Sequence, residues 1–586
     1  MKSIRKFVFV VVVMTMLVMA ACTPAAPQNA PAEQPVDSTA PTTEAAQPAA
    51  AEPAAAEPAA EEAPARSGGV VTIAQEGEPG NLNPMVWATT SDTNITHMIF
   101  DSLVRPDEQL IIEGSLAKDW TVSEDGKTYT FNLYDNVKWH DGEPFTANDV
   151  AFTFTSLADP RYDAGAYSRV EPILGAADFH NGTADSVAGI KVIDDYTVEF
   201  TLAEANASFL ANMFIGVLPE HILKDVSPAD WAKDDFNRAP IGTGPFKFVK
   251  WEPAQYIELT ANMDYFKGAP NLDGIIYRFG DQNTMLAAFM NQEVDIVPVP
   301  VAEVENVKTL DFAEVKTSND LSVYYIGFNL LNEHFKDVKV RQALAYAVNK
   351  QLIVTSILGE YGEVCEDLFP NAHWSHNPNV TTYPYNPEQA MALLEEAGYT
   401  KNAAGIYEKD GKELKFTIEV PTGKKEREKT AVMLKQMWDE IGLGVEIRQL
   451  DFPTLVTKLL PKDKEGKQRT VTAEDYDAYI LGFGVEADPD EYRPYFHSAF
   501  MPPNGYNFVS YSDPEMDELL VNQLLETDQD ARQAIFWEIG KKLSDEQPWI
   551  PIYGQKSVFV SNTKVQGFNP DFRGVTFNAR EWSISQ

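Results

Sequence analysis

Apolar residues recur at helical spacing in two segments of the chain. The segment YNPEQAMALLEEAGY, residues 385–399, places four apolar residues on one helical face: Ala390, Leu393, Leu394 and Ala397. Asn386 is a suitable N-cap, Pro387 suits the first turn, and Gly398 is a typical terminator. The segment VKVRQALAYAVNK, residues 338–350, repeats this spacing with Val340, Ala343, Leu344, Ala347 and Val348. Both patterns predict amphipathic helices.

Short apolar or alternating runs lie between such helical segments. They read GGVVTIAQ, VYYIGFN, LKFTIEV, VEIRQL and YDAYILGF, and runs of this length and composition are typical of strands. No repeat of fixed period is present. Strands that alternate with helices favour α/β lobes.

One polar stretch, VKWHDGEPFTANDVAFTF, places His140 beside Asp141 and at first sight resembles part of a catalytic site. The run YTFNLYDNVKWH alternates as a strand, so neighbouring side chains point to opposite faces and these two cannot readily form a dyad. Asp141-Gly142 indicates a turn, and Thr146 with Asp149 resembles a capping box that begins a helix. We therefore interpret the stretch as strand, turn, cap and helix.

The chain begins with a basic segment followed by an apolar one. Lys2, Arg5 and Lys6 precede an apolar run over residues 7–21 that only Thr15 interrupts. This run is short for a membrane span of about 20 residues and ends in small residues, which is typical of a secretory signal peptide. We therefore expect residues 1–21 to be a signal peptide and the protein to leave the cytoplasm.

Ala20, Ala21 and Cys22 resemble a bacterial lipobox, with Met19 where that pattern prefers Leu. The resemblance implies cleavage before Cys22 and a diacylglycerol on its thiol, and an anchor with at least two acyl chains binds membranes stably. The only other cysteine is Cys365, so the chain has no disulfide framework. We expect Cys365 to be a lone buried thiol.

Residues 22–66 are rich in Ala, Pro, Glu, Gln and Thr, with almost no large apolar residue. Such a composition cannot repay the entropy of ordering, so we expect a disordered tether that starts at the lipidated Cys22. The roughly 520 residues that follow are too many for one core and enough for two or three lobes. No second apolar run approaches membrane-spanning length, so the lipid is the only predicted anchor.

The chain carries a formal net charge of −40 at pH 7, which argues against nucleic acid as a partner and against charge-driven docking on anionic lipid. It contains no G-x-S-x-G elbow, H-E-x-x-H zinc helix or Walker loop, so we predict no catalytic residues and no cofactor. His373 with His376, and the acidic residues 486–492, have spacings that a metal could use, but neither offers a complete ligand set. We expect two surface loops and no bound metal.

Three long segments, at residues 115–154, 242–251 and 324–350, carry a resemblance to a known family. They read SLAKDWTVSEDGKTYTFNLYDNVKWHDGEPFTANDVAFTF, GTGPFKFVKW and YYIGFNLLNEHFKDVKVRQALAYAVNK. In this order they resemble solute-binding protein family 5 of ABC importers. That family comprises dipeptide- and oligopeptide-binding lipoproteins, with nickel, haem, opine and oligosaccharide binders as relatives.

The resemblance implies an α/β fold of the periplasmic-binding-protein type, class II and cluster C, with two lobes, an extra inserted domain and a hinge. Lobe I is expected at residues 67–112, 240–318 and 551–586, the inserted lobe II at 113–239, and lobe III at 319–550. The chain would cross between lobes I and III near residues 318–325 and again near residues 551–553. Closure about these crossings would bury a ligand.

The resemblance also implies ligand contacts. In the segment GFGVEADPDEY, Glu486 takes the carboxylate position that faces a peptide's α-ammonium, and Phe483 takes the aromatic position. The other positions carried over are Trp87, Ala88, Thr89, Tyr167, Tyr324, Tyr325 and Tyr553. For each Trp or Tyr, an aromatic ring that fills the core between the lobes is an equally open interpretation.

Three functions stay open from the sequence. A peptide-binding component of an ABC importer leads, with permease and ATPase subunits as partners, a monomeric state, and a lipid-anchored position outside the cytoplasm. Binding of a non-peptide solute such as an oligosaccharide is the alternative, and a cleft lined by aromatic residues without buried charge favours it. A secreted enzyme is a distant third.

Overall fold

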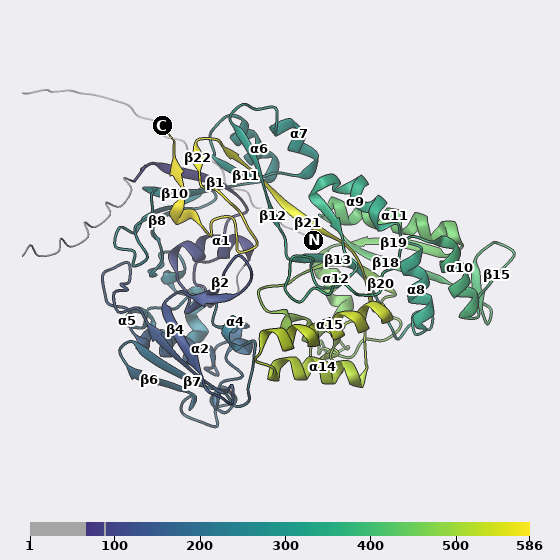
Figure 1. Ribbon diagram of the computed structural model, residues 1–586, viewed down its shortest axis with the longest axis horizontal. Coiled ribbons are helices and arrows are strands. Elements are labelled where there is room, and N and C mark those ends of the chain that lie inside the picture. The colour runs from purple at the N-terminus through teal and green to yellow at the C-terminus, as the bar shows by residue number, and fades with distance from the viewer. Residues whose placement is uncertain (1–65, 87–88, 586) are drawn as a thin grey trace, which may run out of the picture. The chain divides into compact units, whose positions relative to one another are not determined.

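The computed structural model describes residues 66–86 and 89–585. The predicted signal peptide, nearly all of the predicted tether, and Cys22, Trp87 and Ala88 lie outside these residues. Residues 65–586 form one compact unit, whose helices and strands Figure 1 shows.

A large mixed sheet begins in the part of this unit that we call lobe I. Strands β1 (Val70–Glu76) and β10 (Gly274–Gly280) pair in parallel along their whole length. β9 (Tyr256–Ala261) and β8 (Phe246–Glu252) extend the pair in antiparallel fashion, and β11 (Ile296–Pro298) pairs with the other side of β1. The helices of this part are α1 (Thr90–Ile99), α6 (Gln282–Met290) and α7 (Val304–Val307).

The same sheet continues into the part that we call lobe III. β13 (Ser322–Phe328) pairs antiparallel with β20 (Ala478–Gly484), and β18 (Lys415–Pro421) pairs in parallel with β20 and with β19 (Gly444–Leu450). Its helices include α8 (Val338–Tyr346), α9 (Lys350–Ile357), α10 (Pro387–Glu396), α11 (Lys425–Ile441), α12 (Phe452–Leu459), α14 (Pro514–Leu525) and α15 (Gln529–Glu546).

Helices cover both faces of the lobe III sheet, because the side chains of β13 alternate between two cores. Ile326 and Phe328 share a core with residues of α8, α10 and α11. Tyr325 lies in a different core, with residues of α14 and α15. Tyr324 therefore packs on the side of α11, whereas Tyr325 packs on the side of α14 and α15.

A separate antiparallel sheet with the order β4–β5–β7–β6 forms, with α2 (Ala147–Leu157), the part that we call lobe II. Its strands are β4 (Ala117–Val122), β5 (Thr128–Leu133), β6 (Ile190–Asp194) and β7 (Thr197–Thr201). Phe131 and Phe154 meet Phe200 through T-shaped ring contacts. The core of this sheet is continuous with the core under β1 and β10, so lobes I and II share apolar packing.

Short elements complete the fold. The strands are β2 (Val104–Pro106), β3 (Ile112–Gly114), β14 (Gly362–Val364), β15 (Thr400–Lys401), β16 (Tyr407–Lys409), β17 (Lys412–Glu413), β22 (Val565–Gln566) and β23 (Ser583–Ile584). The helices are α3 (Ala176–His180), α4 (Phe209–Asn212), α5 (Glu220–Leu223) and α13 (Arg493–Phe496).

Two adjacent strand crossings join lobes I and III. β12 (Ala313–Asn319) is separated from β13 only by Asp320 and Leu321. β21 (Trp549–Asn562) pairs with β13 and β14 through its first half and with β11 and β12 through its second half. Figure 1 shows β21, in yellow, running from the side of β11 and β12 to the side of β13. A rotation between the lobes would have to bend the chain at these two places.

The local signals in the sequence predicted several elements correctly. Asn386 accepts a hydrogen bond from the Gln389 amide at the start of α10, as expected for its N-cap. At α2, Thr146 accepts from the Asn148 amide, and Asp149 accepts from the Thr146 amide at 2.9 Å. The capping box predicted there is confirmed.

The strand predicted over residues 129–140 is shorter than expected, because β5 ends at Leu133. His140 Nε2 lies 2.9 Å from the Gly244 carbonyl oxygen, whereas Asp141 lies 2.9 Å from His221 Nε2. Burial lowers the pKa of His140 to about 4. His140 and Asp141 therefore bond to different partners, and the prediction that they form no dyad is confirmed.

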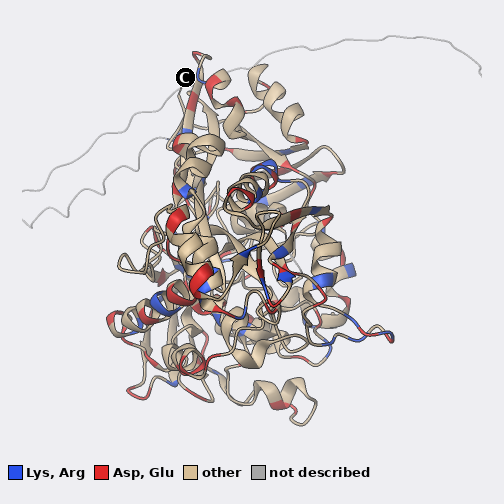
Figure 2. Ribbon diagram, turned by 90° about the vertical axis from the view of Figure 1, so that its right-hand side faces the viewer, with Lys and Arg blue, Asp and Glu red and all other residues tan. Residues whose placement is uncertain are grey.

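Acidic and basic positions are interspersed over the elements that Figure 2 displays, without a large basic face in that view. Among the described residues, no helix is both long and apolar enough to cross a membrane. Cys365 is fully buried, as predicted, and burial raises the pKa of its thiol to about 12.

Candidate functional site

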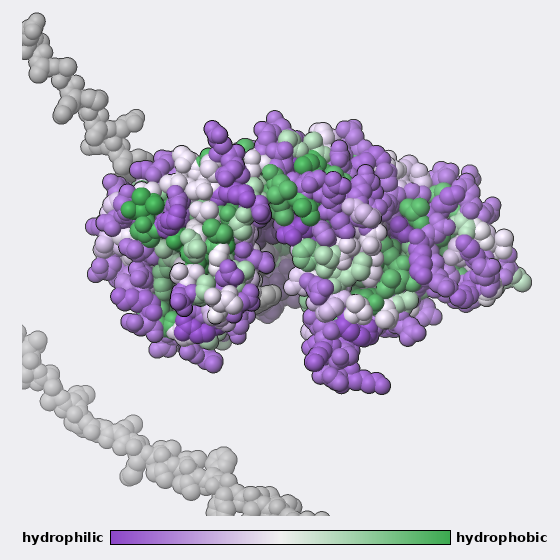
Figure 3. Space-filling view, turned by 90° about the horizontal axis from the view of Figure 1, so that it is seen from below, coloured by the Kyte–Doolittle hydropathy of each residue, from purple (hydrophilic) through white to green (hydrophobic). Residues whose placement is uncertain are grey.

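A cavity of about 1010 Å³ lies where the hinge strands meet lobes I and III. Its wall includes the end of β1, the start of α1 and the C-terminal loop near Asp571 on one side, and the starts of β13 and α11 on the other. The space-filling view in Figure 3 shows the surface hollowed between two parts of the folded unit. The site is therefore built by segments that are distant in sequence.

Asp320 lies at the hinge and lines this cavity. Its Oδ1 accepts a hydrogen bond of 2.6 Å from the Ser557 hydroxyl, and its amide donates to the Gln555 carbonyl oxygen at 3.3 Å. Burial raises the pKa of the Asp320 carboxyl. Among the residues that the structure describes, no cation lies within ion-pair distance of Asp320, so a cationic ligand group would be stabilised there.

Tyr324 also lines the cavity, and its ring stacks on Tyr553 with centroids 4.8 Å apart. The two residues are register partners on β13 and β21, so this stack joins the two hinge strands. Burial raises the pKa of both phenols, and the nearby Arg427 guanidinium opposes the shift in each. Arg427, in the first turn of α11, is a third residue of this wall.

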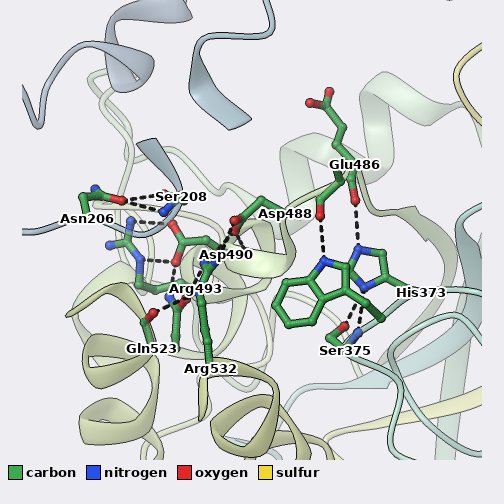
Figure 4. Close-up of polar contacts among 12 residues, drawn as sticks. Asn206, Ser208, His373, Ser375, Glu486, Asp488, Asp490, Arg493, Gln523 and Arg532 are labelled. Carbon is green, nitrogen blue, oxygen red and sulfur yellow. Dashed lines mark hydrogen bonds and ion pairs between the residues drawn. The ribbon is translucent and has the colours of Figure 1, made fainter. Parts of the chain in front are cut away.

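The backbone of the Glu486 loop is held by two ring side chains from residues 373–374. His373 Nε2 lies 3.1 Å from the Glu486 carbonyl oxygen, and Trp374 Nε1 donates to the Ala487 carbonyl oxygen at 2.9 Å. The Ser375 hydroxyl lies 2.7 Å from the other nitrogen of His373 and so orients the ring. Figure 4 shows these contacts beside the Glu486 side chain, which points away from them.

The acidic residues that follow are fixed by arginines. Asp488 forms a two-point ion pair with Arg532, at 2.6 and 2.8 Å, and their side chains are 14% and 4% exposed. Asp490 pairs with Arg493 at 2.9 Å, and Gln523 donates to both Asp490 and the Leu520 carbonyl oxygen. This network, also drawn in Figure 4, makes the loop a rigid support for Glu486.

The Glu486 side chain itself is 62% exposed and lines the cavity. Its carboxylate lies 3.7 Å from Arg169 of lobe II. The Glu486 amide donates to the Glu491 carboxylate at 3.1 Å, and burial together with the neighbouring charge of Glu486 raises the pKa of Glu491. Two carboxylates thus share one end of the cavity and favour a cationic group there.

The remaining predicted ligand residues lie elsewhere. Tyr325 is 2% exposed and stacks on Trp549 with centroids 3.8 Å apart, and Tyr553 is 0% exposed beneath Tyr324. Phe483 packs against Tyr492 and Tyr495. The Tyr167 ring stacks on His180 with centroids 3.9 Å apart. Thr89 is the N-cap of α1. The structure brings only Glu486 and Tyr324 of the predicted set to the cavity wall; Trp87 and Ala88 lie outside the described residues.

Two expectations about surface loops are wrong. His373 is 3% exposed because its ring is enclosed between Ser375 and the Glu486 backbone. The acidic segment of residues 486–492 is largely tied down, because its carboxylates meet Arg532 and Arg493 and because Tyr492 is 1% exposed. Among the described residues no group of His, Cys, Asp or Glu side chains has the arrangement of a metal site.

Of the charged residues on the wall, sequence reasoning assigned only Glu486 to the site; Asp320, Arg427 and Glu491 are among those it did not assign. Arg427 stands in the charged run TGKKEREK, where one basic residue looks like any other. Asp320 follows β12 in an Asn-Asp pair that suggests only a turn. A hinge expected near residues 318–325 was the one signal that could have pointed to Asp320.

Two bodies joined by paired hinge strands, with a large charged cavity at the junction, define a two-lobed α/β solute-binding protein. The sequence matches "Bacterial extracellular solute-binding proteins, family 5 Middle" over residues 112–501. The chain belongs to this family of bacterial extracellular solute-binding proteins. The predicted family and fold class are both confirmed.

Individual relatives have different ligands in their names. The oligopeptide-binding protein AppA of Bacillus subtilis is 30% identical over 528 residues, which cover 89% of this chain and 92% of AppA. Its structure with a nonapeptide matches with a TM-score of 0.72, covering 89% of this chain and all of the other. NikZ of Campylobacter jejuni, in complex with Ni(L-His), is 28% identical with a TM-score of 0.73, covering 88% and 99% of the two chains. Heme-binding protein A of Haemophilus influenzae is 28% identical, with 78% of this chain and 81% of that protein covered.

Proposed function

We propose that this protein captures short peptides in the cavity between lobes I and III and delivers them to the permease and ATPase subunits of an ABC importer. In this proposal it acts as a monomer, binds its ligand reversibly and catalyses no reaction. Glu486 and Tyr324 are its ligand contacts among the residues predicted from sequence. The lobes follow the boundaries predicted above, and the two strand crossings are the hinge about which they close.

The observation that carries the proposal is the charge of the cavity wall. Nine lining residues carry charge, six acidic and three basic: Glu76, Asp320, Glu426, Glu486, Glu491, Asp571, Lys424, Arg427 and Lys556. Only Tyr324, Phe559 and Phe572 are aromatic. A zwitterionic peptide can pair with both kinds of charge, whereas an oligosaccharide gains most from stacking on aromatic rings. The wall therefore favours a peptide over a sugar.

Native mass spectrometry of the purified protein tests this function. We expect a bound mass in the range of short peptides, which denaturation releases and fragmentation identifies as amide-linked amino acids. Protein unfolded and refolded without ligand serves as the control and should lack the extra mass. Release of a sugar, a haem or a nickel complex in place of peptides would contradict the proposal.

The proposed position is outside the cytoplasm, with lipid on Cys22 as the anchor. The change Cys22→Ser is expected to move the protein from the membrane fraction to the soluble fraction, because the acyl chains supply the apolar burial that holds it. The matched change Cys365→Ser should leave the protein in the membrane fraction, since that thiol is buried in lobe III. A wild-type protein that is soluble and has no lipid mass on Cys22 would refute this anchor.

A further inference from the structure

A second cavity, of about 290 Å³, lies in lobe I and shares no lining residue with the cavity between lobes I and III. Its wall is rich in charge although the chain has 87 acidic residues against only 47 basic ones. The basic lining residues are Arg105, Lys267, Arg573 and Arg580, and the acidic ones are Asp107, Glu108, Glu113 and Glu581. The cavity therefore gathers four cations from three segments that are far apart in the sequence.

Lys267 is a cation of this cavity without a carboxylate partner. Its Nζ donates to the Gly114 carbonyl oxygen at 3.3 Å and lies 5.4 Å from the centre of the Phe266 ring. Among the described residues, no carboxylate lies within ion-pair distance of this ammonium. Burial, followed by the neighbouring charge of Arg105, lowers the pKa of Lys267 to about 8. An ammonium in such a position would be stabilised by a counter-ion.

The arginines offer further donors to the same cavity. Arg105 donates only through Nε, so its two terminal amino groups bond to no residue of the described chain. The Phe577 ring contacts both Arg105 and Arg573, with its centroid 5.1 and 3.8 Å from their guanidinium carbons, which helps to hold both groups in place. Arg580 Nη1 donates to the Lys267 carbonyl oxygen at 2.6 Å and so keeps its guanidinium beside the lysine.

The acidic lining residues neutralise these cations only in part. Glu108, Glu113 and Glu581 have exposed side chains, and ion pairs of solvated carboxylates are weak. The fourth acidic residue accepts hydrogen bonds from amides of its own turn. Of the three arginines, Arg573 has a less exposed partner, Asp571. The other two arginines and the lysine are left with donors for an additional anion.

We propose that this cavity binds a small dianionic oxyanion, such as inorganic phosphate, held by Lys267 and Arg105 with Arg580 beside them. An ammonium and two guanidinium groups can donate to separate oxygens of a tetrahedral ion. The net charge of −40 repels anions from the protein in general, so binding must depend on these local donors. The bound ion would connect β2, the segment at Lys267 and the C-terminal segment, and would thereby stabilise lobe I.

Isothermal titration calorimetry with inorganic phosphate tests the site, with sodium chloride at the same ionic strength as the control for screening. We expect a single phosphate ion to bind each wild-type chain. Lys267→Gln should weaken this binding by about 10- to 100-fold, because a hydrogen bond between charged groups is lost. Lys250→Gln removes an exposed charge of β8 outside the cavity and should bind phosphate as the wild type does.

A pH series checks that Lys267 is the group that holds the ion. Arg105 and Arg580 lower the pKa of Lys267, whereas Asp101 and Glu113 raise it, and a bound anion would raise it further. Phosphate affinity should therefore fall as the pH rises above about 8, where Lys267 of the free protein loses its proton. Phosphate itself does not lose charge in that range. The variant Lys267→Gln should show no such fall.

Thermal unfolding gives a second readout and shows whether the variants fold. Phosphate should raise the melting temperature of the wild type and of Lys250→Gln more than that of Lys267→Gln. Without phosphate, Lys267→Gln should melt no lower than the wild type, since its amine bonds to a single carbonyl oxygen. If Lys267→Gln does not fold, Arg105→Gln carries the same test with the same expected loss. Equal binding by the variant and the wild type, or no binding by the wild type at about 10 mM phosphate, would refute the site.

Discussion

The substitution Asp488→Asn is expected to lower the free energy of unfolding by about 3–5 kcal/mol, the cost of leaving a buried charge without its partner. Arg532, 4% exposed, would keep its contacts to Gln523 but lose both ion-pair contacts to Asp488. Urea denaturation followed by tryptophan fluorescence measures the change. Peptide affinity should fall as well, because the same network holds the Glu486 loop at the cavity.

A matched control and a double variant identify the cause of that loss. Glu333→Gln removes one partner of the exposed pair with Lys412 and should leave the unfolding curve unchanged, since solvated pairs contribute little. Arg532→Met combined with Asp488→Asn removes the unpaired charge and should be more stable than Asp488→Asn alone. A loss below about 1 kcal/mol in Asp488→Asn would show that the pair is not a structural support of the loop.

Elements with local signals could be predicted from the sequence. The capping box of Thr146 and Asp149, and the Asn386 cap of α10, depend on residues within one helical turn. The strand-forming runs at β13, β18, β19 and β20 lie within two residues of their predicted bounds. Helix caps and strand-forming runs depend on residues that are close in sequence, so composition and spacing are sufficient to predict where these elements lie.

Burial that depends on distant partners could not be predicted in this way. Asp488 looks like a solvated acid in the sequence, but Arg532 lies 44 residues further along the chain. The Trp374 backbone, next to His373, accepts a hydrogen bond from Gln533, 159 residues away. A surface loop and a buried loop of the same composition differ only in such partners. The family resemblance implied a two-lobed fold, but it implied none of these contacts.

The tyrosines of β13 show the same limit at the site. Adjacent residues of a strand must face opposite sides, so Tyr324 and Tyr325 could not both line one cavity. The sequence does not say which of them does, because that depends on which helices cover each face. In the structure α15 covers the face of Tyr325, and the face of Tyr324 meets the cavity near α11. The position of Arg427 on the cavity wall likewise becomes apparent only once α11 is placed beside Tyr324.

The second large effect is expected at Glu486, which the proposal pairs with the peptide's α-ammonium. Glu486→Gln removes the charge with little change in volume and should weaken binding of tetraalanine by about 2–5 kcal/mol. N-acetyl-tetraalanine should lose a similar amount with the wild type and little more with the variant. Calorimetry on the four combinations measures the coupling between the carboxylate and the ammonium.

The size of this coupling also tests closure, because Glu486 is 62% exposed and lies 3.7 Å from Arg169. A carboxylate left in water contributes only about 0–1 kcal/mol to such a pair, so a larger value requires that closure removes the water. The Arg169 side chain, 27% exposed, would then remain beside the same carboxylate. Additive losses, or no loss from Glu486→Gln, would mean that Glu486 only pairs with Arg169 across the lobes. Asp320, which has no cationic partner among the described residues, would become the next position to change.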